Sequence, residues 1–299
     1  MSPKGRPGGK RSAGPRDRRR GGPPARGRGA GGGADVRRSG PRTLGGDQVE
    51  GRQAVRELLL AGRRRVKEVW LAEDVAADGV VGDIVDLAGE LRVPLKRVAR
   101  RRLEERAASE APQGVLATAA PLPEEDLDRL CRVGDGPPPF LVFLDGVTDP
   151  QNLGALLRTA ECAGATGAVL PRHRSASITP TVAKAAAGAV EHLPLAVVPG
   201  IPGALARARE LGIWLVGLDA GGEASAFDLP LATEPVGLVL GAEGKGLSRL
   251  TRARCDVLAA IPLQGALGSL NVAAAGALAC FEVTRRRLAT RPQPGPGGD

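Results

Sequence analysis

Three uninterrupted apolar runs constrain the fold of this chain more than any other feature of its sequence. They span residues 140–144, 236–240 and 257–261, and small or polar residues follow where the runs end. A continuous apolar run is typical of a strand that is buried on both faces. Helical periodicity lies between such runs, as in Leu153, Leu156, Leu157 and Ala160. The pattern predicts an α/β fold whose ligands bind at the carboxyl ends of the strands.

A glycine-rich loop, Gly241-Ala242-Glu243-Gly244-Lys245-Gly246, follows the second of these runs. It is not a phosphate-binding P-loop, because Val239 occupies the position of the first glycine and Gly246 the position of the Ser/Thr. The dinucleotide G-x-G-x-x-G spacing also fails, at Glu243. Glycines let the main chain approach a ligand closely, so the loop predicts a pocket for a small flat cofactor. The alternative is a flexible turn between a strand and a helix.

Basic charge is concentrated at the N-terminus of the 299-residue chain. Residues 1–46 contain thirteen Lys/Arg and two Asp, a net charge of +11, whereas the remaining residues carry a net charge of −2. This Arg/Gly/Pro-rich arm has almost no apolar side chain to bury and is predicted to be disordered. Such segments commonly follow phosphate backbones with salt-dependent affinity. The alternative is a solubilising extension.

Cysteine and histidine usage excludes several classes of protein. The four cysteines are far apart and form no C-x-x-C pair, which favours buried thiols in a reducing compartment. With only His173 and His192, no histidine-rich metal site is expected. The N-terminus lacks the apolar core of a secretory signal, and no apolar run is long enough to span a membrane. We therefore expect a cytoplasmic protein without a metal.

Composition shifts divide the rest of the chain into two α/β regions. Residues 47–121 alternate helices, expected at 48–62 and 84–91, with strands expected at 66–72 and 113–119. Proline and glycine punctuate residues 122–139, the predicted linker. The second region spans 140–290, with further strands at 168–170, 195–198 and 213–218 and further helices at 179–189 and 203–211. Its last helix is predicted to start near Ser269 as N-cap, and residues 291–299 form a disordered tail.

Three segments in the second region together carry a family signature. They are residues 145–160, which include Asp149-Pro150-Gln151-Asn152 and Arg158; residues 238–247; and residues 261–272, which include Ser269-Leu270-Asn271. Their order and spacing resemble the three motifs of the SpoU (TrmH-like) RNA ribose 2′-O-methyltransferases of the SPOUT superfamily. Residues 49–55 also resemble the opening of the small RNA-binding domain, similar to ribosomal protein L30e, that precedes the catalytic domain in ribosomal RNA members of this family.

The resemblance implies a fold and a reaction that residue patterns alone do not. It implies a C-terminal trefoil knot, S-adenosyl-L-methionine as cofactor and a homodimer formed through the methyltransferase domain. The implied substrate is a guanosine ribose of 23S ribosomal RNA, in the P-loop of the peptidyl-transferase centre. A tRNA substrate, a thiostrepton-resistance methylation and a non-catalytic RNA-binding assembly factor are the alternatives. The upstream α/β region argues against tRNA, and the intact motifs argue against an inactive relative.

The resemblance also assigns roles to residues. Gly241, Ile261 and Leu270 are expected to contact the cofactor through main-chain atoms. The expected catalytic residues are Arg158, Asn152, Glu243, Ser269 and Asn271. Asn152 is expected to orient ribose or phosphate, and Glu243 to anchor a loop amide or Arg158.

Each assignment has a structural alternative. A guanidinium scarcely deprotonates in proteins, so Arg158 more easily holds a phosphate and stabilises the developing alkoxide than acts as a base. Without the motif, Arg158 would be a salt-bridging helix residue, Asn152 a turn residue and Ser269 a helix cap. Arg172, His173 and Arg174 form a basic cluster that is either a solvated loop or a phosphate contact.

Overall fold

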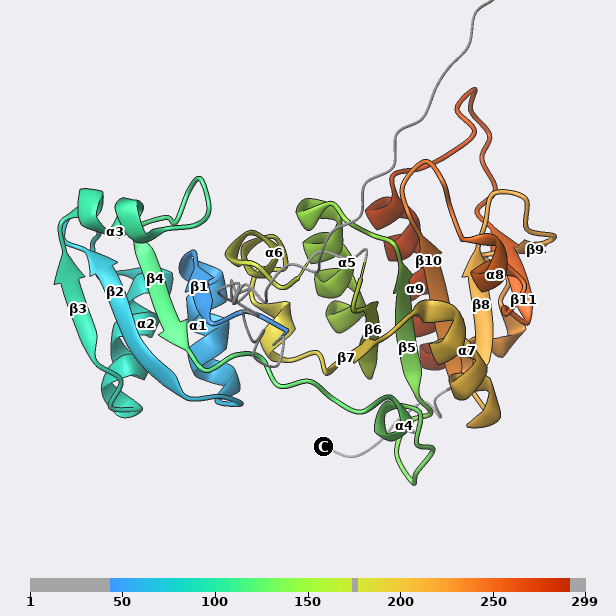
Figure 1. The fold of residues 1–299 in the computed structure, drawn as a ribbon, viewed down its shortest axis with the longest axis horizontal. Coiled ribbons are helices and arrows are strands. Elements are labelled where there is room, and N and C mark those ends of the chain that lie inside the picture. The colour runs from blue at the N-terminus through green and yellow to red at the C-terminus, as the bar shows by residue number, and fades with distance from the viewer. Residues whose placement is uncertain (1–43, 174–176, 291–299) are drawn as a thin grey trace, which may run out of the picture. The chain divides into compact units, whose positions relative to one another are not determined.

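The computed structural model describes residues 44–173 and 177–290 (Figure 1). Most of the predicted basic arm, Arg174 and the predicted C-terminal tail lie outside the described residues. Residues 44–46 pack against the rest of the fold, because Leu44 is 6% exposed and the Leu122 amide donates to the Gly45 carbonyl over 2.9 Å. No helix in the described ranges is long and apolar enough to cross a membrane.

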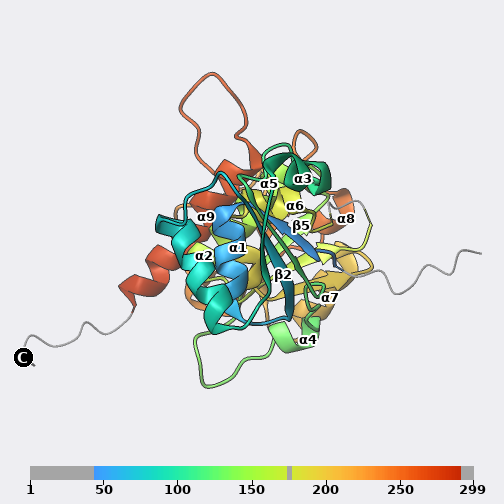
Figure 2. The same ribbon diagram turned by 90° about the vertical axis from the view of Figure 1, so that its left-hand side faces the viewer.

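Residues 48–119 form a four-stranded mixed sheet with three helices. The sheet has the order β1-β4-β2-β3, in which β4 is antiparallel to both of its neighbours and β2 and β3 are parallel. Its elements are β1 (Gln48–Glu50), α1 (Arg52–Ala61), β2 (Val66–Ala72), α2 (Gly79–Glu90), β3 (Leu95–Val98), α3 (Arg100–Arg106) and β4 (Val115–Ala119). In Figure 2, α1 and α2 lie side by side along one side of β2.

The helix predicted over 48–62 is wrong at its start. Residues 48–50 pair with β4 as a strand, and Gly51 adopts a left-handed φ of 93° before α1 begins. The register places Val49 in the core and pairs Glu50 with Leu116. Burial of this segment between sheet and loop therefore overrides its helical periodicity.

Glu50 is a buried carboxylate that holds the loop after α3. It accepts hydrogen bonds from the amides of Ala108 and Ser109 over 2.7 and 2.9 Å, from the Ser109 hydroxyl and from the Gln48 side chain. Burial raises the pKa of Glu50, but these hydrogen bonds outweigh it, so the pKa lies below its usual value. Because the pKa in the folded state is lowered, the carboxylate stabilises the fold above the pKa of an unfolded Glu.

We expect Glu50→Gln to lower the free energy of unfolding at pH 7 by about 1–3 kcal/mol, since buried donors lose a charged acceptor. The wild-type advantage should shrink as the pH falls below about 4.5, where the unfolded carboxylate binds a proton. Chemical denaturation between pH 3 and 7 measures both effects. Glu73→Gln, at an exposed position, is the control. An advantage that grows on acidification would contradict this assignment.

The larger sheet has seven strands, and all of its pairs are parallel. Its order is β7-β6-β5-β10-β8-β11-β9. The strands are β5 (Phe140–Asp145), β6 (Gly167–Pro171), β7 (Leu195–Val198), β8 (Trp214–Leu218), β9 (Ala224–Ser225), β10 (Val236–Gly241) and β11 (Val257–Ala260). Every residue of β10 is buried, as its continuous apolar run predicts. The predicted α/β fold is confirmed.

Helices cover both faces of this sheet, so side chains alternate between two cores. The helices are α4 (Leu127–Leu130), α5 (Pro150–Cys162), α6 (Pro180–Ala185), α7 (Ile201–Glu210), α8 (Arg249–Arg252) and α9 (Val272–Ala289), with 3-10 turns η1 (Ala189–Glu191) and η2 (Pro230–Thr233). In β5, Phe140, Val142 and Leu144 join one core with α5 and α9, whereas Leu141 and Phe143 join the other with α4 and α7.

Two helix predictions in this region need correction. The last helix begins at Val272 rather than near Ser269, because Asn271 is its N-cap and accepts from the amides of Ala273 and Ala274. The helix predicted to continue to 189 ends at Ala185, and positive φ values at Ala187 and Gly188 turn the chain before η1.

Gly154 lets α5 and α6 pack at close range. A Cβ at this position would lie 2.4 Å from the Cβ of Ala185 and 2.8 Å from the Val182 carbonyl oxygen. This close packing fixes the position of α5, the helix that carries both Asn152 and Arg158.

A buried ion pair links the turn after α1 to η1. The side chains of Arg64 and Glu191 are 3% and 1% exposed, and Arg64 Nη2 lies 2.5 Å from Glu191 Oε1. Arg64 also donates to the carbonyls of Gly46 and Ala120, and Arg63 donates to the carbonyls of Glu191 and His192. Because these hydrogen bonds satisfy both charges, the pair can remain buried.

Candidate active site

The glycine-rich loop closes on itself directly after β10. The amide of Ala242 donates to the Gly246 carbonyl over 3.1 Å, and the amide of Gly246 donates back to Ala242 over 2.8 Å. A Cβ on Gly241 would lie 2.1 Å from the Gly246 carbonyl carbon and 2.4 Å from the Leu247 nitrogen. Only glycine therefore fits at 241, and Gly244 and Gly246 supply the left-handed φ values of 73° and 62° that the turn needs.

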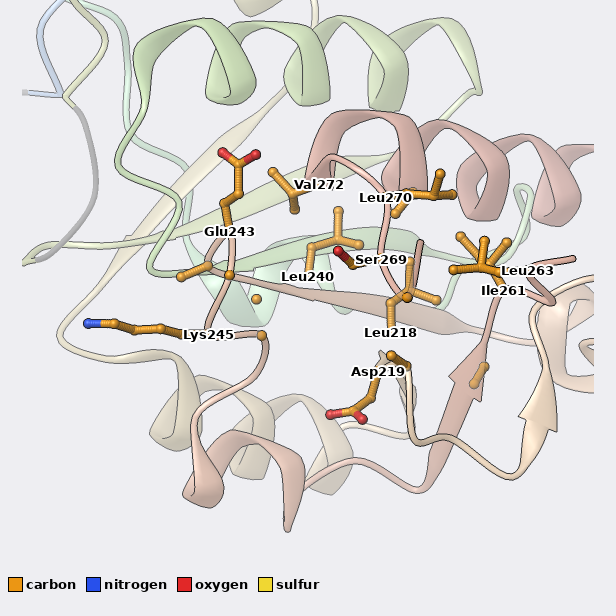
Figure 3. A pocket seen from close by; sticks show the side chains of 18 of the residues that line it. Leu218, Asp219, Leu240, Glu243, Lys245, Ile261, Leu263, Ser269, Leu270 and Val272 are labelled. Carbon is orange, nitrogen blue, oxygen red and sulfur yellow. The ribbon is translucent and has the colours of Figure 1, made fainter. Parts of the chain in front are cut away.

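A cleft of about 430 Å³ opens beside this loop. The loops after β8, β10 and β11 line it together with the first turn of α9 (Figure 3). Gly241, Ile261 and Leu270, the three predicted cofactor contacts, all line this one cleft, as does Ser269. Leu218, Leu240 and Leu263 add apolar surface, while the Lys245 side chain extends away from them. Such a mixture of apolar walls and accessible main chain suits a small organic ligand.

A closed set of hydrogen bonds brings three predicted catalytic side chains together. Asn152 Nδ2 donates to Glu243 Oε2 over 2.9 Å, and Asn271 Nδ2 donates to Asn152 Oδ1 over 2.9 Å and to Glu243 Oε1 over 3.4 Å. Helix capping also fixes two of these residues. The main-chain amide of Asn152 donates to the Asp149 carboxylate at the start of α5, and the Asn271 side chain caps α9. Glu243 thus anchors side-chain amides, where a loop amide or Arg158 was expected.

Ser269 and Glu243 line the cleft and Asn152 and Asn271 bond to Glu243, whereas Arg158 lies apart from all four. It is exposed on α5 and lines a different cavity, of about 530 Å³, together with Glu57, Glu161 and His192. At 3.6 residues per turn, six residues rotate the helix by about 240°, so Arg158 and Asn152 face different sides. Within one chain, Arg158 and the Asn152–Glu243–Asn271 set are separate.

Two polar groups near the cleft were not predicted from the sequence. Asp145 accepts from the Thr251 hydroxyl over 2.5 Å and from the Ser248 amide over 3.3 Å, which ties the end of β5 to the end of the glycine loop. Asp219 pairs with Arg252 over 3.0 Å, and both line the cleft. The sequence could have indicated both residues, because Asp145 and Asp219 directly follow apolar strands, where ligands bind in α/β folds.

Three cysteine thiols are too basic to act as nucleophiles. Burial raises the pKa of Cys131, Cys255 and Cys280 to about 12 in each case. Since the thiolate is the reactive form, these thiols are inert near neutral pH.

Comparison with known proteins places the site in a family. Residues 139–281 match the model of the SpoU rRNA methylase family, and residues 48–125 match that of the RNA 2′-O ribose methyltransferase substrate-binding domain. The chain is 42% identical over 248 residues to the 23S rRNA (guanosine-2′-O-)-methyltransferase RlmB of Pseudomonas syringae pv. tomato, covering 82% of this chain and 98% of the relative. The chain belongs to the SpoU family of rRNA methylases.

Two further SpoU proteins are similar to this chain over most of its length. The RlmB of Photobacterium profundum is 36% identical, covering 82% of this chain and 99% of the relative. The crystal structure of the SpoU methyltransferase AviRb from Streptomyces viridochromogenes, in complex with AdoMet, superposes with a TM-score of 0.67 at 28% identity, covering 82% of this chain and 91% of AviRb. Membership of the family predicted from the three motifs is confirmed.

Proposed function

We propose that this protein transfers the methyl group of S-adenosyl-L-methionine to the ribose 2′-hydroxyl of a guanosine in 23S ribosomal RNA. The main support is that residues 241–246 and 268–270 line one cleft, while Asn152 and Asn271 hydrogen-bond to Glu243 at the edge of that cleft. The similarity to two RlmB enzymes along nearly their whole length supports the choice of guanosine and of 23S rRNA.

The residues of the cleft fit S-adenosylmethionine. Gly241, which has no room for a side chain, leaves main-chain groups accessible next to Ile261 and Leu270, and these can meet an adenine edge. Leu218 and Leu240 provide apolar contact for the ring. When bound, the cofactor supplies an electrophilic methyl group on a sulfonium, so the acceptor oxygen needs orientation and loss of its proton.

Asn152 is the residue that orients the acceptor ribose, and Asn271 holds the Asn152 amide in place. Their amides are fixed by Glu243, whose two carboxylate oxygens both accept amide hydrogens. Holding the hydroxyl in line with the methyl–sulfur bond contributes several kcal/mol, up to about 7–11 in ideal cases. Ser269 adds a hydroxyl to the wall of the same cleft. We assign to Arg158 the stabilisation of the developing alkoxide and the holding of an RNA phosphate.

The separation of Arg158 from the cleft supports a homodimer in which each site takes Arg158 from the other copy. An apolar stripe on α9 offers a surface for this contact. Ala274, Leu278 and Phe281 are exposed at helical spacing, with Phe281 48% exposed, and Arg285 and Leu288 continue this face with one charged and one apolar side chain. Apolar side chains gathered on one exposed helix face are typical of an interaction surface.

The finer fold assignments follow from the same family. We propose that residues 47–121 form an L30e-like domain that binds the RNA substrate, 122–139 a linker, and 140–290 a trefoil-knotted methyltransferase domain. The position of β10 between β5 and β8, with the segments after β10 and β11 sharing one cleft, supports the knot. A ribosomal RNA substrate places the reaction in the cytoplasm.

Mapping of ribose methylation tests the proposed function. Ribosomal RNA from cells with and without the intact gene is compared nucleotide by nucleotide. The proposal predicts that one 23S guanosine loses its 2′-O-methyl group when the gene is disrupted and regains it on complementation. An unchanged map would reject the proposal.

Deletion of the basic arm, residues 1–43, is expected to weaken RNA binding and to flatten its salt dependence. Its charge contributes counterion release, and each phosphate contact changes the slope of log K against log salt by about 0.9 for a duplex. Affinity for S-adenosylhomocysteine should not change, because every residue that lines the cleft lies between Leu218 and Ala275. RNA titrations from low to high salt measure the slope, and an unchanged slope would contradict this role.

A further inference from the structure

A second cavity, of about 890 Å³, lies next to the cofactor cleft. The two cavities share a boundary, which consists of Ala242, Glu243, Lys245, Gly246 and Val272. The loops after β5, β6 and β7 and the start of α7 complete the second cavity. We propose that this cavity binds the target nucleotide, with its base against the wall from β6 and α7 and its ribose at the shared boundary. The proposal rests on the proposed function and adds the substrate site to it.

The position of Asn152 shows how a nucleotide here would meet a methyl donor. Asn152 lines the second cavity, and Glu243, its hydrogen-bond partner, lines both. A ribose hydroxyl bonded to the Asn152 amide therefore lies at the junction of the two cavities. An acceptor that entered from the far side of the second cavity would leave the cofactor cleft free.

The far wall of the second cavity suits the face of a base. Pro171 ends β6, and Pro199, Ile201 and Pro202 follow β7, so that three proline rings and one branched side chain line one region. Prolines have no N–H group that needs a partner, and their φ is fixed, so this surface is apolar and rigid. His173 adds an aromatic ring at the end of β6, and aromatic rings stack on bases.

Lys245 is the position around the second cavity that suits a phosphate. The carboxylates of Asp145, Asp149 and Glu243 also line this cavity, and each accepts hydrogen bonds from neighbouring amides or hydroxyls. Lys245 lines it from the glycine loop, and the described part of the chain gives its ammonium no carboxylate partner within 4.0 Å. An apolar wall, an aromatic ring and an available cation together match a nucleotide.

Two substitutions test this site without touching the cofactor cleft. Thr148 lines only the second cavity and is exposed, so Thr148→Trp should fill the space and lower kcat/KM for a 23S rRNA fragment about 100-fold. His173→Ala should lower it about 10-fold through loss of stacking. Both variants should bind S-adenosylhomocysteine with wild-type affinity in calorimetry. Ala220→Trp, in the cofactor cleft only, should instead lose S-adenosylhomocysteine binding.

The results of these experiments distinguish failure of the nucleotide site from failure of the proposed methyltransferase function. Wild-type kcat/KM in both Thr148→Trp and His173→Ala, with an active parent enzyme, would overturn the nucleotide site and leave the methyltransferase function intact. Lost S-adenosylhomocysteine binding in both variants would also overturn it, because the two cavities would not act separately. A parent enzyme that methylates no RNA would reject the proposed function itself. His173 is exposed, so its variant keeps the test valid if Thr148→Trp fails to fold.

Discussion

Gly241→Ala is expected to abolish cofactor binding in a protein that still folds. The new methyl group would lie 2.1 Å from the Gly246 carbonyl carbon and 2.3 Å from its oxygen, so the loop would have to open. The obstacle is backbone and cannot rotate away, unlike the Leu156 side chain that faces Gly276. We expect the affinity for S-adenosylhomocysteine to fall at least about 100-fold, or ~2.7 kcal/mol, in calorimetry.

Gly265→Ala is the matched control for this experiment. Gly265 lies in the loop before α9, and a Cβ at this position meets nothing within 4 Å. Its affinity should equal that of the wild type, and circular dichroism should show that both variants are folded. If Gly241→Ala bound S-adenosylhomocysteine normally, the glycine loop would not form the cofactor site.

Arg158→Ala is expected to remove most methyl transfer while leaving cofactor binding unchanged. Loss of one group that stabilises developing negative charge typically lowers kcat by about 10²–10³. Because Arg158 does not line the cofactor cleft, the calorimetric affinity for S-adenosylhomocysteine should remain that of the wild type. Single-turnover methylation of a 23S rRNA fragment measures the rate. A normal rate would show that Arg158 has no part in methyl transfer.

Mixed dimers reveal which chain supplies Arg158. An Arg158→Ala subunit keeps its cofactor cleft, and a Gly241→Ala subunit keeps its arginine, so neither homodimer should be active. If the arginine acts on the other copy's cofactor, a heterodimer of the two has one complete site and about half of the wild-type activity. Inactive heterodimers would show that each site uses its own Arg158 or that the copies do not share sites.

The α/β fold and the position of its site could be predicted from the sequence, because both depend on local patterns. Continuous apolar runs marked β5 and β10 as buried on both faces, and their ends marked the ligand edge. Gly241, Ile261 and Leu270 were predicted to share a pocket, and all three line one cleft. The resemblance to a family was needed to connect residues 145–160 with the two segments that follow residue 237.

Features that depend on tertiary packing could not be predicted. The strand at 48–50 forms because it pairs with β4, more than 60 residues away, although its periodicity is helical. Asn271 and Ser269 are both good N-cap residues, and only the path of the loop selects Asn271. The Asp145–Thr251 contact joins residues 106 apart in the chain. The direction of Arg158, in contrast, follows from helix geometry and could have been derived from its spacing to Asn152.

Methyl transfer to a guanosine ribose can be measured directly with a labelled donor. The purified full-length protein is incubated with unmethylated 23S rRNA and S-adenosylmethionine labelled in the methyl group, and the RNA is digested to nucleosides for mass spectrometry. We expect label in 2′-O-methylguanosine with the wild-type protein and none with the Gly241→Ala variant. Label in a base-methylated nucleoside, or no label with folded wild-type protein, would contradict the proposed function.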